Sequence, residues 1–375
     1  MIDKKKVVII ADALDFQYAG IKVYLEGLVG ALEEGDVQHE YILLRADEDF
    51  RDYAGQVYVK SYVSQFLHPK SRLLVEIPRT IKQINPDIVV EPCHFGPFRI
   101  SDKIKKVTFI HDITPVTHPQ FHPNNSVLLH KLLMPGVLKR ANLVVTNSER
   151  TKADVIANYI YAKGKVEVLY PGNIALSNQS FAPIEKIDIE NERFILHVGT
   201  IEPRKNLEFL LTCFQELRDK KDGIKLVISG KEGWKNKSFF ERIKTHPYQD
   251  DIIVTGYLET EQIMALYRYA SCMLFTSHYE GFGIPLLEAM QYGCPIITSN
   301  NSAQKEVCKD AAVYIDEFVA ADWANAFLAV DEDENLRSQL KRRGKQRARQ
   351  FNWKKTALKF DRLMTKMYEF GPKKK

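Results

Sequence analysis

Apolar and polar positions alternate in blocks along the whole chain, and these blocks predict strands and helices in turn. Short apolar runs, typical of buried strands, are followed by longer stretches with apolar residues at helical spacing. In the first half, the predicted strands lie near residues 7–11, 41–44, 87–90, 107–110, 143–146 and 166–169. In the second half, they lie near residues 194–198, 224–229, 252–255, 273–275, 295–298 and 312–315. The alternation predicts an α/β protein with two doubly wound parallel sheets.

The periodic pattern is interrupted between Tyr170 and Glu190, where we expect the linker between two domains. A length of 375 residues also favours two domains, and a hydrophobic content of 45% is enough for two cores. The predicted segments are residues 1–180 for the first domain, 181–355 for the second domain and 356–375 for a terminal helix.

The chain carries a formal net charge of +5 at pH 7, which is mild for its length. Its cations gather in clusters, which are usually solvated faces but can also attract anionic lipid headgroups or a lipid diphosphate. Nucleic acid is not expected as a partner, because no recognition motif accompanies the charge. The clusters are Lys103, Lys105 and Lys106; Lys139 and Arg140; Lys341, Arg342, Arg343, Lys345, Arg347 and Arg349; and Lys373, Lys374 and Lys375.

Cysteine usage and the absence of targeting signals indicate a cytoplasmic protein. The five cysteines are scattered and show no C-x-x-C spacing, as expected for free thiols in a reducing cytosol. The sequence contains no run of about 20 apolar residues, so no membrane-spanning helix is predicted. The start at Met1 lacks the apolar core and the cleavage site of a signal peptide.

Two glutamates flank a glycine loop between a predicted strand and a predicted helix. Glu280 and Glu288 lie on either side of Gly281 and Gly283, which let the backbone approach a ligand closely. Pro285 suits the start of the helix, and the free N–H groups of a helix start favour a phosphate. A carboxylate on each side can accept hydrogen bonds from hydroxyl groups. A phosphate between two hydroxyl-bearing groups describes a sugar nucleotide.

A second motif follows the predicted strand at residues 194–198. It runs from Gly199 through Pro203 to the adjacent cations Arg204 and Lys205. Cations at a helix start oppose the helix dipole, which disfavours the interpretation that they are merely solvated. The motif therefore predicts an anion site. Fixed positive charge is what a leaving diphosphate needs, since electrostatic stabilisation is usually the largest catalytic contribution.

Both motifs resemble those of a known enzyme family. Glu280 and Glu288, with seven residues between them, resemble the E-x7-E signature of the retaining glycosyltransferases of family 4, which have the GT-B fold. The stretch from Gly199 to Lys205 resembles the family's G-x-x-x-P-R-K segment. One departure is Thr200, since many members of the family carry Arg directly after that glycine.

The resemblance implies a role for each residue of the two motifs. It implies that Lys205 binds the donor diphosphate with help from Arg204. It also implies that Glu280 contacts the transferred sugar and that Glu288 holds the ribose of the nucleotide. The loop residues expected to meet sugar and phosphate are Gly199, Gly281, Phe282, Gly283 and Ile284.

A third motif, at the carboxyl end of the predicted strand at residues 107–110, begins with His111 and Asp112. Ligands bind at such strand ends in α/β sheets. The stretch to Pro115 resembles the H-D-x-x-P segment of a mannosyltransferase-like branch of the family, in which the His lies near the transferred sugar. We therefore expect His111 to position or polarise the sugar, while Asp112 either orients His111 or contacts substrate. For three other histidines a structural hydrogen bond is the commoner role: His94, His118 and His122.

Weaker signals fit the same family. Gly20 follows the first predicted strand, where the family has a glycine loop and frequently a Gly-Gly pair. In the family, the loops after two second-domain strands border the nucleotide base, which adds Gly230, Tyr257 and Leu258 to the expected donor-binding residues. Residues 351–357 resemble an F-x-W-x-x-T-A element before a terminal helix that crosses back onto the first domain. We expect its tryptophan only to pack.

The resemblance implies two Rossmann-like domains that face a cleft, the first holding the acceptor and the second a nucleotide-diphosphate sugar. It implies retaining transfer of a hexose, with mannose from GDP-mannose as the first choice, to a lipid-linked intermediate of a bacterial surface polysaccharide. No cofactor or metal is expected. Residues 331–333 match a D-x-D string that holds a metal in another transferase class, but we interpret them as a solvated loop. The expected location is the cytoplasm, with peripheral contact to the cytoplasmic membrane face.

Other functions stay open at this point. A UDP-hexose donor would use nearly the same motifs, and one hydroxyl group in a pocket decides such a choice. A sugar-nucleotide epimerase with the same fold would need an additional acid/base pair and no acceptor. A non-catalytic binding protein is disfavoured, because Lys205, Glu280 and Glu288 are all present. Dinucleotide binding is disfavoured, because no G-x-G-x-x-G follows the first predicted strand.

Overall fold

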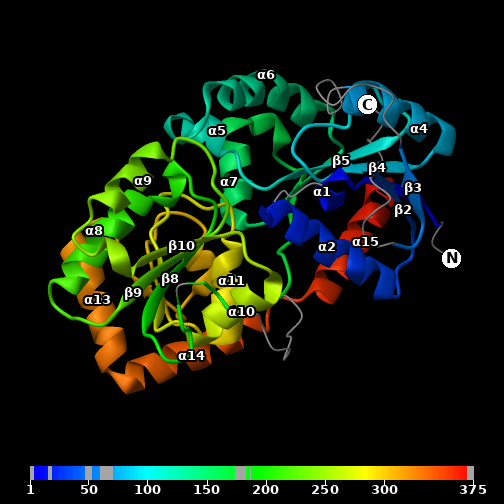
Figure 1. Ribbon diagram of the computed structural model, residues 1–375. Helices are drawn as coiled ribbons and strands as arrows, with labels where there is room; N and C mark the ends of the chain where they lie inside the picture. Colours follow the sequence, from blue (N-terminus) through cyan, green and yellow to red (C-terminus); the bar gives the residue numbers. More distant parts are fainter. Residues whose placement is uncertain are drawn as a thin grey trace. The chain divides into compact units, whose positions relative to one another are not determined.

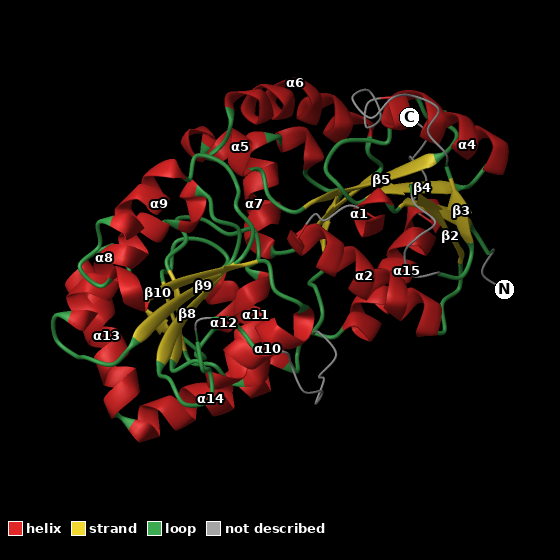
Figure 2. Cartoon of the chain, viewed as in Figure 1, coloured by secondary structure: helices red, strands yellow, loops and turns green. Residues whose placement is uncertain are grey.

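The computed structural model describes residues 4–15, 19–46, 53–59, 71–173, 183–185 and 187–369 (Figures 1 and 2). The chain forms two compact units. The first unit contains the chain up to Val116, then Asn125–Gly172 and the residues from Asn352 onward. The second unit contains Thr117–Asn124 and Asn173–Phe351. The domain boundary predicted at residue 180 and the basic cluster at residues 373–375 lie outside the described residues.

The first unit is built on a seven-stranded parallel sheet with the order β3-β2-β1-β4-β5-β6-β7. The strand order changes direction between β1 and β4, and the carboxyl ends of strands at such a point form a usual ligand site. The strands are β1 (Lys6–Ile10), β2 (Glu40–Arg45), β3 (Gln56–Tyr58), β4 (Ile88–Glu91), β5 (Lys105–Ile110), β6 (Leu143–Thr146) and β7 (Val166–Val168). The sequence pattern does not predict β3, because a three-residue edge strand is too short to show a period.

Helices cover both faces of this sheet (Figure 2). They are α1 (Asp12–Asp15), α2 (Ala19–Glu34), the π-helical turn η1 (Arg72–Glu76), α4 (Ile77–Ile84), α5 (Thr114–Thr117), α6 (Asn124–Arg140), α7 (Glu149–Asn158), the 3-10 turn η3 (Ile160–Ala162) and α15 (Trp353–Glu369). Successive side chains of a strand point to opposite faces. Val7 and Ile9 of β1 accordingly belong to the core formed with α2 and α15, and Val8 and Ile10 to the core formed with α4.

The C-terminal helix α15 packs on α2, so the last described part of the chain completes the core of the first unit. Its first residue, Trp353, lies edge-on against Tyr24 with the ring centroids 5.2 Å apart. A side chain on Gly27 or Gly172 would collide with Trp353, at contact distances of 2.0 and 2.2 Å. The two glycines therefore provide the space in which the tryptophan packs.

The second unit contains a six-stranded parallel sheet with the order β10-β9-β8-β11-β12-β13. Its strands are β8 (Phe194–Val198), β9 (Lys225–Ser229), β10 (Ile252–Gly256), β11 (Cys272–Phe275), β12 (Ile296–Thr298) and β13 (Val313–Tyr314). Its helical elements are the 3-10 turns η2 (Pro119–Phe121), η4 (Pro203–Lys205) and η5 (Gln249–Asp251), with α8 (Leu207–Arg218), α9 (Lys237–Lys244), α10 (Thr260–Tyr269), α11 (Ile284–Tyr292), α12 (Gln304–Cys308), α13 (Ala320–Glu332) and α14 (Glu334–Ala348).

The main core of the second unit lies between its sheet and the helices α8 and α13. Leu210 and Phe214 of α8 and Trp323 and Phe327 of α13 are all at most 1% exposed in this core. The apolar residues that recur at helical spacing in α8 therefore form the face that packs on the sheet. Within the described parts of the chain, no helix is long and apolar enough to span a bilayer.

The prediction of a solvated loop at residues 331–333 was wrong for Asp331, whereas Glu332 and Asp333 are exposed. Asp331 and Glu332 end α13, and the Asp331 side chain is 6% exposed. Its carboxylate forms ion pairs with Arg193 and with Lys221, whose Nζ is 2.8 Å away. These partners lie more than 100 residues away in the sequence, so local composition could not reveal them.

Candidate active site

The glycine motif after β8 folds as a loop and one 3-10 turn. Pro203 begins η4, where its fixed φ suits the first helical position. Asn206 then adopts the left-handed conformation (φ 56°), which ends η4 and allows α8 to begin at Leu207. Arg204 and Lys205 are thereby held on a short turn beyond the carboxyl end of β8.

Gly199 and Gly230 allow the loops after β8 and β9 to meet backbone to backbone. A side chain on Gly230 would lie 2.1 Å from the carbonyl oxygen of Gly199, and the φ of Gly230 is +149°. The N–H of Gly199 donates to the Ser229 carbonyl at 2.9 Å, and the N–H of Ile201 donates to the Lys231 carbonyl at 2.9 Å. Both glycines predicted to approach a ligand therefore lie where the two loops come together.

Lys205 and Glu280 form a buried ion pair. The Lys205 Nζ lies 2.6 Å from Glu280 Oε1, and each side chain is 7% exposed. Arg204 Nη1 lies 3.0 Å from the other oxygen, Oε2, and its Nη2 lies 2.5 Å from Glu202 Oε1. Burial alone would raise the pKa of Glu280, but Arg204 and Lys205 outweigh it and lower the pKa to about 2. The Glu280 carboxylate is therefore ionised at neutral pH and lies between two cations.

Hydrogen bonds to backbone carbonyls join the loop that carries Glu280 to the turn that carries Lys205. The hydroxyl of Thr276 donates to the carbonyl of Lys205 at 2.9 Å. The N–H of His278 donates to the carbonyl of Arg204, also at 2.9 Å. These bonds fix the ends of β8 and β11 against each other, so the two sequence motifs form one site.

The start of α11 follows the glycine loop directly. Gly283 is its N-cap with φ 89°, and Pro285 lies in its first turn. The positive φ of Gly283 favours glycine at this position, where an added side chain would also lie 2.9 Å from Leu286 Cδ1. The ring of Phe282 is buried edge-on against Phe351, with centroids 5.6 Å apart. Its side chain is therefore part of the core, and its backbone is the part available to a ligand. Of two other predicted loop residues, Gly281 is buried and Ile284 is half-buried.

Glu288 lies on α11 and is hydrogen-bonded to a residue that the sequence did not single out. The Tyr267 hydroxyl of α10 donates to Glu288 Oε2 at 2.7 Å, and both side chains are buried. Burial raises the pKa of Glu288 to about 7, although the Tyr267 hydrogen bond acts in the opposite direction. Glu288 thus titrates near neutral pH, in contrast to Glu280.

The loops after β9 and β10 are joined near the predicted base-binding residues. The N–H of Gly230 donates to the Gly256 carbonyl at 2.9 Å. Tyr257 is 59% exposed, and the Lys231 Nζ lies 4.9 Å from the centre of its ring. Leu258 is half-buried beside it. An exposed aromatic ring with an adjacent cation is a suitable surface for stacking a nucleotide base.

In the first unit, His111 lies directly after β5 and is neutral at pH 7. Its Nε2 lies 2.9 Å from the carbonyl oxygen of Pro92, which requires the proton on Nε2. Burial lowers the pKa of His111, an effect that the Pro92 hydrogen bond and Asp112 partly offset. Asp112 itself accepts hydrogen bonds from the N–H and the hydroxyl of Thr114, at 3.0 and 2.6 Å. Gly20, also predicted as a site residue, lies exposed in the first turn of α2.

His94 has the structural role that the sequence favours. Its Nε2 accepts a hydrogen bond from the N–H of His111 at 3.0 Å, so this nitrogen is unprotonated. Burial lowers the pKa of His94 to about 3, assisted by the neighbouring His111. His130 of α6 lies edge-on to His94, with ring centroids 6.0 Å apart. His130 was not identified from the sequence, because helical spacing alone gives it no chemical signal.

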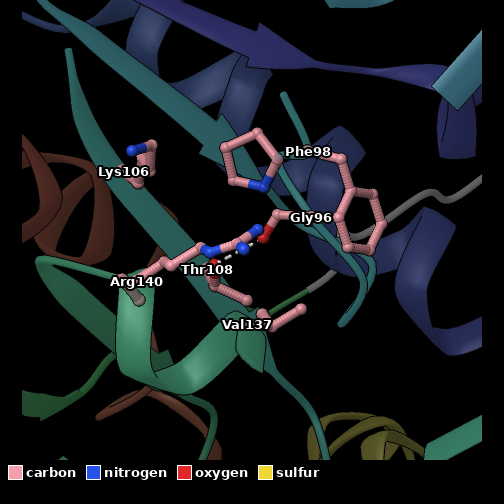
Figure 3. Close-up of a pocket in the computed structure, with 8 residues that line it drawn as sticks. Gly96, Phe98, Lys106, Thr108, Val137 and Arg140 are labelled. Atoms are coloured by element: carbon pink, nitrogen blue, oxygen red, sulfur yellow. Dashed lines mark hydrogen bonds between the residues drawn. The ribbon is translucent and has the colours of Figure 1, made fainter. Parts of the chain in front are cut away.

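A small pocket in the first unit is lined by none of the predicted site residues (Figure 3). It is lined by Gly96, Phe98, Lys106, Thr108 and Arg140 together with three apolar residues, and the Thr108 hydroxyl donates to the Gly96 carbonyl at 2.9 Å. Its accessible volume of about 10 Å³ is what one water molecule needs. It is therefore too small for a sugar nucleotide. Across the described ranges, no three His, Cys, Asp or Glu side chains form a group that could hold a metal ion.

Two family models match the chain. Residues 18–173 match the family described as Glycosyltransferase Family 4, and residues 181–347 match the family described as Glycosyl transferases group 1. Together the two matches cover most of the sequence. The chain belongs to these glycosyltransferases.

Curated relatives and solved structures agree with this assignment. The glycosyltransferase is 28% identical to the O-antigen chain mannosyltransferase B of Escherichia coli over 271 residues, which are 70% of either chain. It is 29% identical, over 62% of its length and 63% of the other, to the N-acetylgalactosamine-N,N'-diacetylbacillosaminyl-diphospho-undecaprenol 4-alpha-N-acetylgalactosaminyltransferase of Campylobacter jejuni. Its structure resembles sucrose-phosphate synthase of Thermosynechococcus elongatus with a TM-score of 0.76 and 15% identity, over 98% and 100% of the two chains. The predicted GT-B fold is thereby confirmed.

Proposed function

We propose that this glycosyltransferase moves a hexose from a nucleotide-diphosphate sugar to a growing glycan, with retention of the anomeric configuration and GDP-mannose as the donor. The observation that carries the proposal is the buried cluster of Arg204, Lys205 and Glu280 beyond β8 and β11. Two fixed cations beside a carboxylate suit a donor whose diphosphate leaves as its sugar is transferred. The choice of mannose is supported by the similarity to an O-antigen chain mannosyltransferase and by the H-D-x-x-P segment that begins at His111.

In this proposal, Lys205 and Arg204 stabilise the leaving diphosphate. Within the described part of the chain, Glu280 is the one hydrogen-bond acceptor of the Lys205 ammonium. An ammonium group has three N–H donors, so Lys205 can donate to phosphate oxygens while it stays paired. The low exposure of the pair strengthens these interactions, because the local dielectric constant is lower than in water.

Glu280 is proposed to bind hydroxyl groups of the transferred sugar. A carboxylate with a pKa of about 2 is a weak base, so it is poorly suited to remove the acceptor's proton. We assign that proton to an oxygen of the leaving diphosphate. The bond between the anomeric carbon and the phosphate oxygen breaks, the bond to the acceptor oxygen forms on the same face, and the proton passes to the phosphate.

Glu288 is proposed to accept hydrogen bonds from the ribose hydroxyls, with Tyr267 holding its carboxyl group in place. The exposed ring of Tyr257, next to Lys231, is proposed to stack on the base. In the first unit, the neutral imidazole of His111 is proposed to bind a sugar hydroxyl. Its Nε2 proton is engaged with the Pro92 carbonyl, which fixes the orientation of the ring.

We further propose that the reaction needs no divalent metal, because Lys205 and Arg204 supply the positive charge that a metal would supply. Chelation with EDTA should then leave turnover intact. Loss of activity that Mg²⁺ or Mn²⁺ restores would show that the diphosphate requires a metal.

The acceptor is proposed to be lipid-linked at the cytoplasmic face of a membrane, as the diphospho-undecaprenol in the name of the Campylobacter jejuni relative suggests. The helix α6 supports this proposal. It exposes the side chains of Leu128, Leu129 and Leu132, of which Leu132 is 68% exposed. The same helix carries cations and no acidic residue. An apolar face with flanking cations suits an anionic lipid surface. Its exposed cations are Lys131, Lys139 and Arg140.

The test is a transfer assay with labelled GDP-mannose and a short polyprenyl-diphosphate-linked oligosaccharide, in parallel with UDP-glucose and UDP-galactose. The proposal expects product from GDP-mannose with the anomeric configuration of the donor, read by the one-bond C–H coupling in NMR. Product from a UDP-hexose would correct the donor, and a product of inverted configuration would overturn retention. Conversion of free donor without an acceptor would identify an epimerase.

A further inference from the structure

A piece of the first half of the chain is built into the second unit. The strap segment, Thr117–Asn124, is part of that unit, although the residues before and after it belong to the first. It links α5 to α6 and contains the short turn η2. The second unit also carries Arg204, Lys205 and Glu280, so the contacts of the strap segment within this unit bear on the proposed donor site.

Two side chains from elsewhere in the second unit donate hydrogen bonds to backbone carbonyls of the strap segment. Trp234 Nε1–H donates to the carbonyl of Phe121 at 2.7 Å. The Lys235 ammonium donates to the carbonyls of Gln120 and His122, at 3.1 and 2.8 Å. Trp234 and Lys235 belong to the loop after β9, which pairs with the glycine motif after β8. One side of the strap segment is therefore hydrogen-bonded to the loop after β9, which is in turn hydrogen-bonded to the loop that leads to Lys205.

Aromatic rings on the other side of the strap segment contact the loop that carries Glu280. Phe121 stacks on His278, with ring centroids 5.0 Å apart and an interplanar angle of 8°. His118 lies against Tyr279, also with centroids 5.0 Å apart. Tyr279 immediately precedes Glu280, and its carbonyl accepts a hydrogen bond from Arg204 Nη1 at 2.8 Å. The strap segment thus contacts the two residues that directly precede Glu280 in the chain.

We propose that the strap segment is a positioning element of the donor site and that Phe121 is its central positioning residue. Phe121 acts through His278: the stacked pair holds the loop in the conformation in which Glu280 meets Lys205 and Arg204. The inference rests on the proposed function, because it takes Glu280 to be a sugar-binding group. It assigns part of the donor-binding machinery to a segment of the first half of the chain.

The test compares Phe121→Ala, Phe121→Leu and Phe121→Tyr in calorimetric titrations of the full chain with GDP-mannose and with GDP. Loss of one aromatic contact costs about 3- to 10-fold in an equilibrium constant. Affinity for GDP-mannose should fall by about this factor in the Ala and Leu variants and recover in the Tyr variant, which keeps the ring. Affinity for GDP, which lacks the sugar that Glu280 binds, should change less than twofold. A merely structural defect would weaken both ligands together.

A second pair of variants tests the opposite side of the strap segment. Lys235→Ala removes the ammonium that binds two carbonyls of the strap segment, and it should also weaken GDP-mannose binding. Lys237→Ala is the matched control: it removes the same charge two residues later, from a side chain that is exposed and has no hydrogen bond or ion pair to any other described residue. The control should bind as the unmodified protein does. Equal weakening in both variants would point to net charge and would overturn the role of the strap segment.

Hydrogen exchange separates failure of this inference from failure of the proposed function. Amides of residues 276–283 should exchange faster in Phe121→Ala than in the unmodified protein and in Lys237→Ala, whether or not a nucleotide binds. If the unmodified protein binds neither ligand, the proposed donor fails, and the exchange rates alone decide the positioning role. If it binds GDP-mannose and Phe121→Ala matches it in affinity and exchange, the positioning role is overturned while the proposed function stands.

Discussion

The Lys205 ammonium and the Glu280 carboxylate, 75 positions apart in the chain, lie 2.6 Å from each other with both side chains buried. The proposed phosphate-binding cation and the proposed sugar-binding anion are therefore partners of each other. Removing either one deprives the other, which is buried, of a close counter-charge, and this is costly. A single substitution at this site therefore affects catalysis and folding together.

Lys205→Met should lower the free energy of unfolding by about 3 kcal/mol, because Glu280 then stays buried with Arg204 as its remaining cation. The double variant Lys205→Met, Glu280→Gln should recover most of that stability, since no buried charge is left uncompensated. Its transfer rate should nevertheless stay about 100-fold or more below that of the unmodified protein. Urea unfolding and single-turnover transfer measure the two effects. A stable double variant with normal turnover would refute the phosphate role of Lys205.

Because of Glu288, the free energy of unfolding should decrease as the pH rises from about 4.5 to about 7. Burial raises its pKa from 4.5 to about 7, so between these values the unfolded chain releases a proton that the folded protein retains. Stability from this group is fully present below pH 4.5, declines as the pH rises and levels off above 7, a change of about 3 kcal/mol. Glu288→Gln cannot titrate, so its stability relative to the unmodified protein should rise across this window. A pH-independent difference would contradict the raised pKa.

Tyr267→Phe provides the companion measurement. The Tyr267 hydrogen bond lowers the pKa of Glu288, so removing the hydroxyl should raise that pKa further and move the upper end of the window above pH 7. Denaturant unfolding of the Phe variant from pH 4 to 9 locates the midpoint. A midpoint that stays in place would show that the hydrogen bond to Glu288 is energetically unimportant.

Two glycines of α2 should respond to alanine in opposite ways. A side chain on Gly27 would lie 2.0 Å from the ring of Trp353, so Gly27→Ala should destabilise the protein by about 1–3 kcal/mol. Gly30 lies on the same helix with nothing within 4 Å of the added carbon. Gly30→Ala should therefore stabilise by about 0.5–1 kcal/mol through helix propensity. Thermal unfolding of both variants tests the packing of α15 on α2. Equal changes in stability in the two variants would contradict this packing.

The exposed leucines of α6 should contribute to membrane binding. Leu132→Asp places a negative charge on the apolar face and should reduce flotation with vesicles containing phosphatidylglycerol by severalfold. Val319→Asp is the control, because Val319 is an exposed apolar residue of the second unit, 43% exposed. The control should float as the unmodified protein does. Equal flotation of both variants would show that α6 is not part of the membrane-binding surface.

The fold was predictable because both sheets are parallel and buried, which leaves continuous apolar runs in the sequence. The site motifs were predictable for a related reason: Lys205 and Glu280 each follow a strand end, and the carboxyl ends of parallel strands share one edge of a sheet. Their direct contact was not predictable, since it depends on backbone bonds such as that from His278 to Arg204.

The neighbours of the site residues were the part that sequence could not supply. Tyr267 reaches Glu288 from another helix, and no local pattern distinguishes it from a core tyrosine. The stacking of Phe121 on His278 joins residues more than 150 positions apart, and a proline- and histidine-rich loop has no period that could reveal such a contact. Asp331 was interpreted as solvated for the same reason, because its partners are distant in the chain.

The proposed donor site is tested by calorimetric titration of the unmodified protein and of Glu288→Gln with GDP, UDP, ADP and their mannose or glucose conjugates, without added metal. We expect selective binding of GDP-mannose by the unmodified protein and at least tenfold weaker binding by the variant. Binding that is equal in the two proteins, or no binding of any nucleotide sugar, would contradict this expectation.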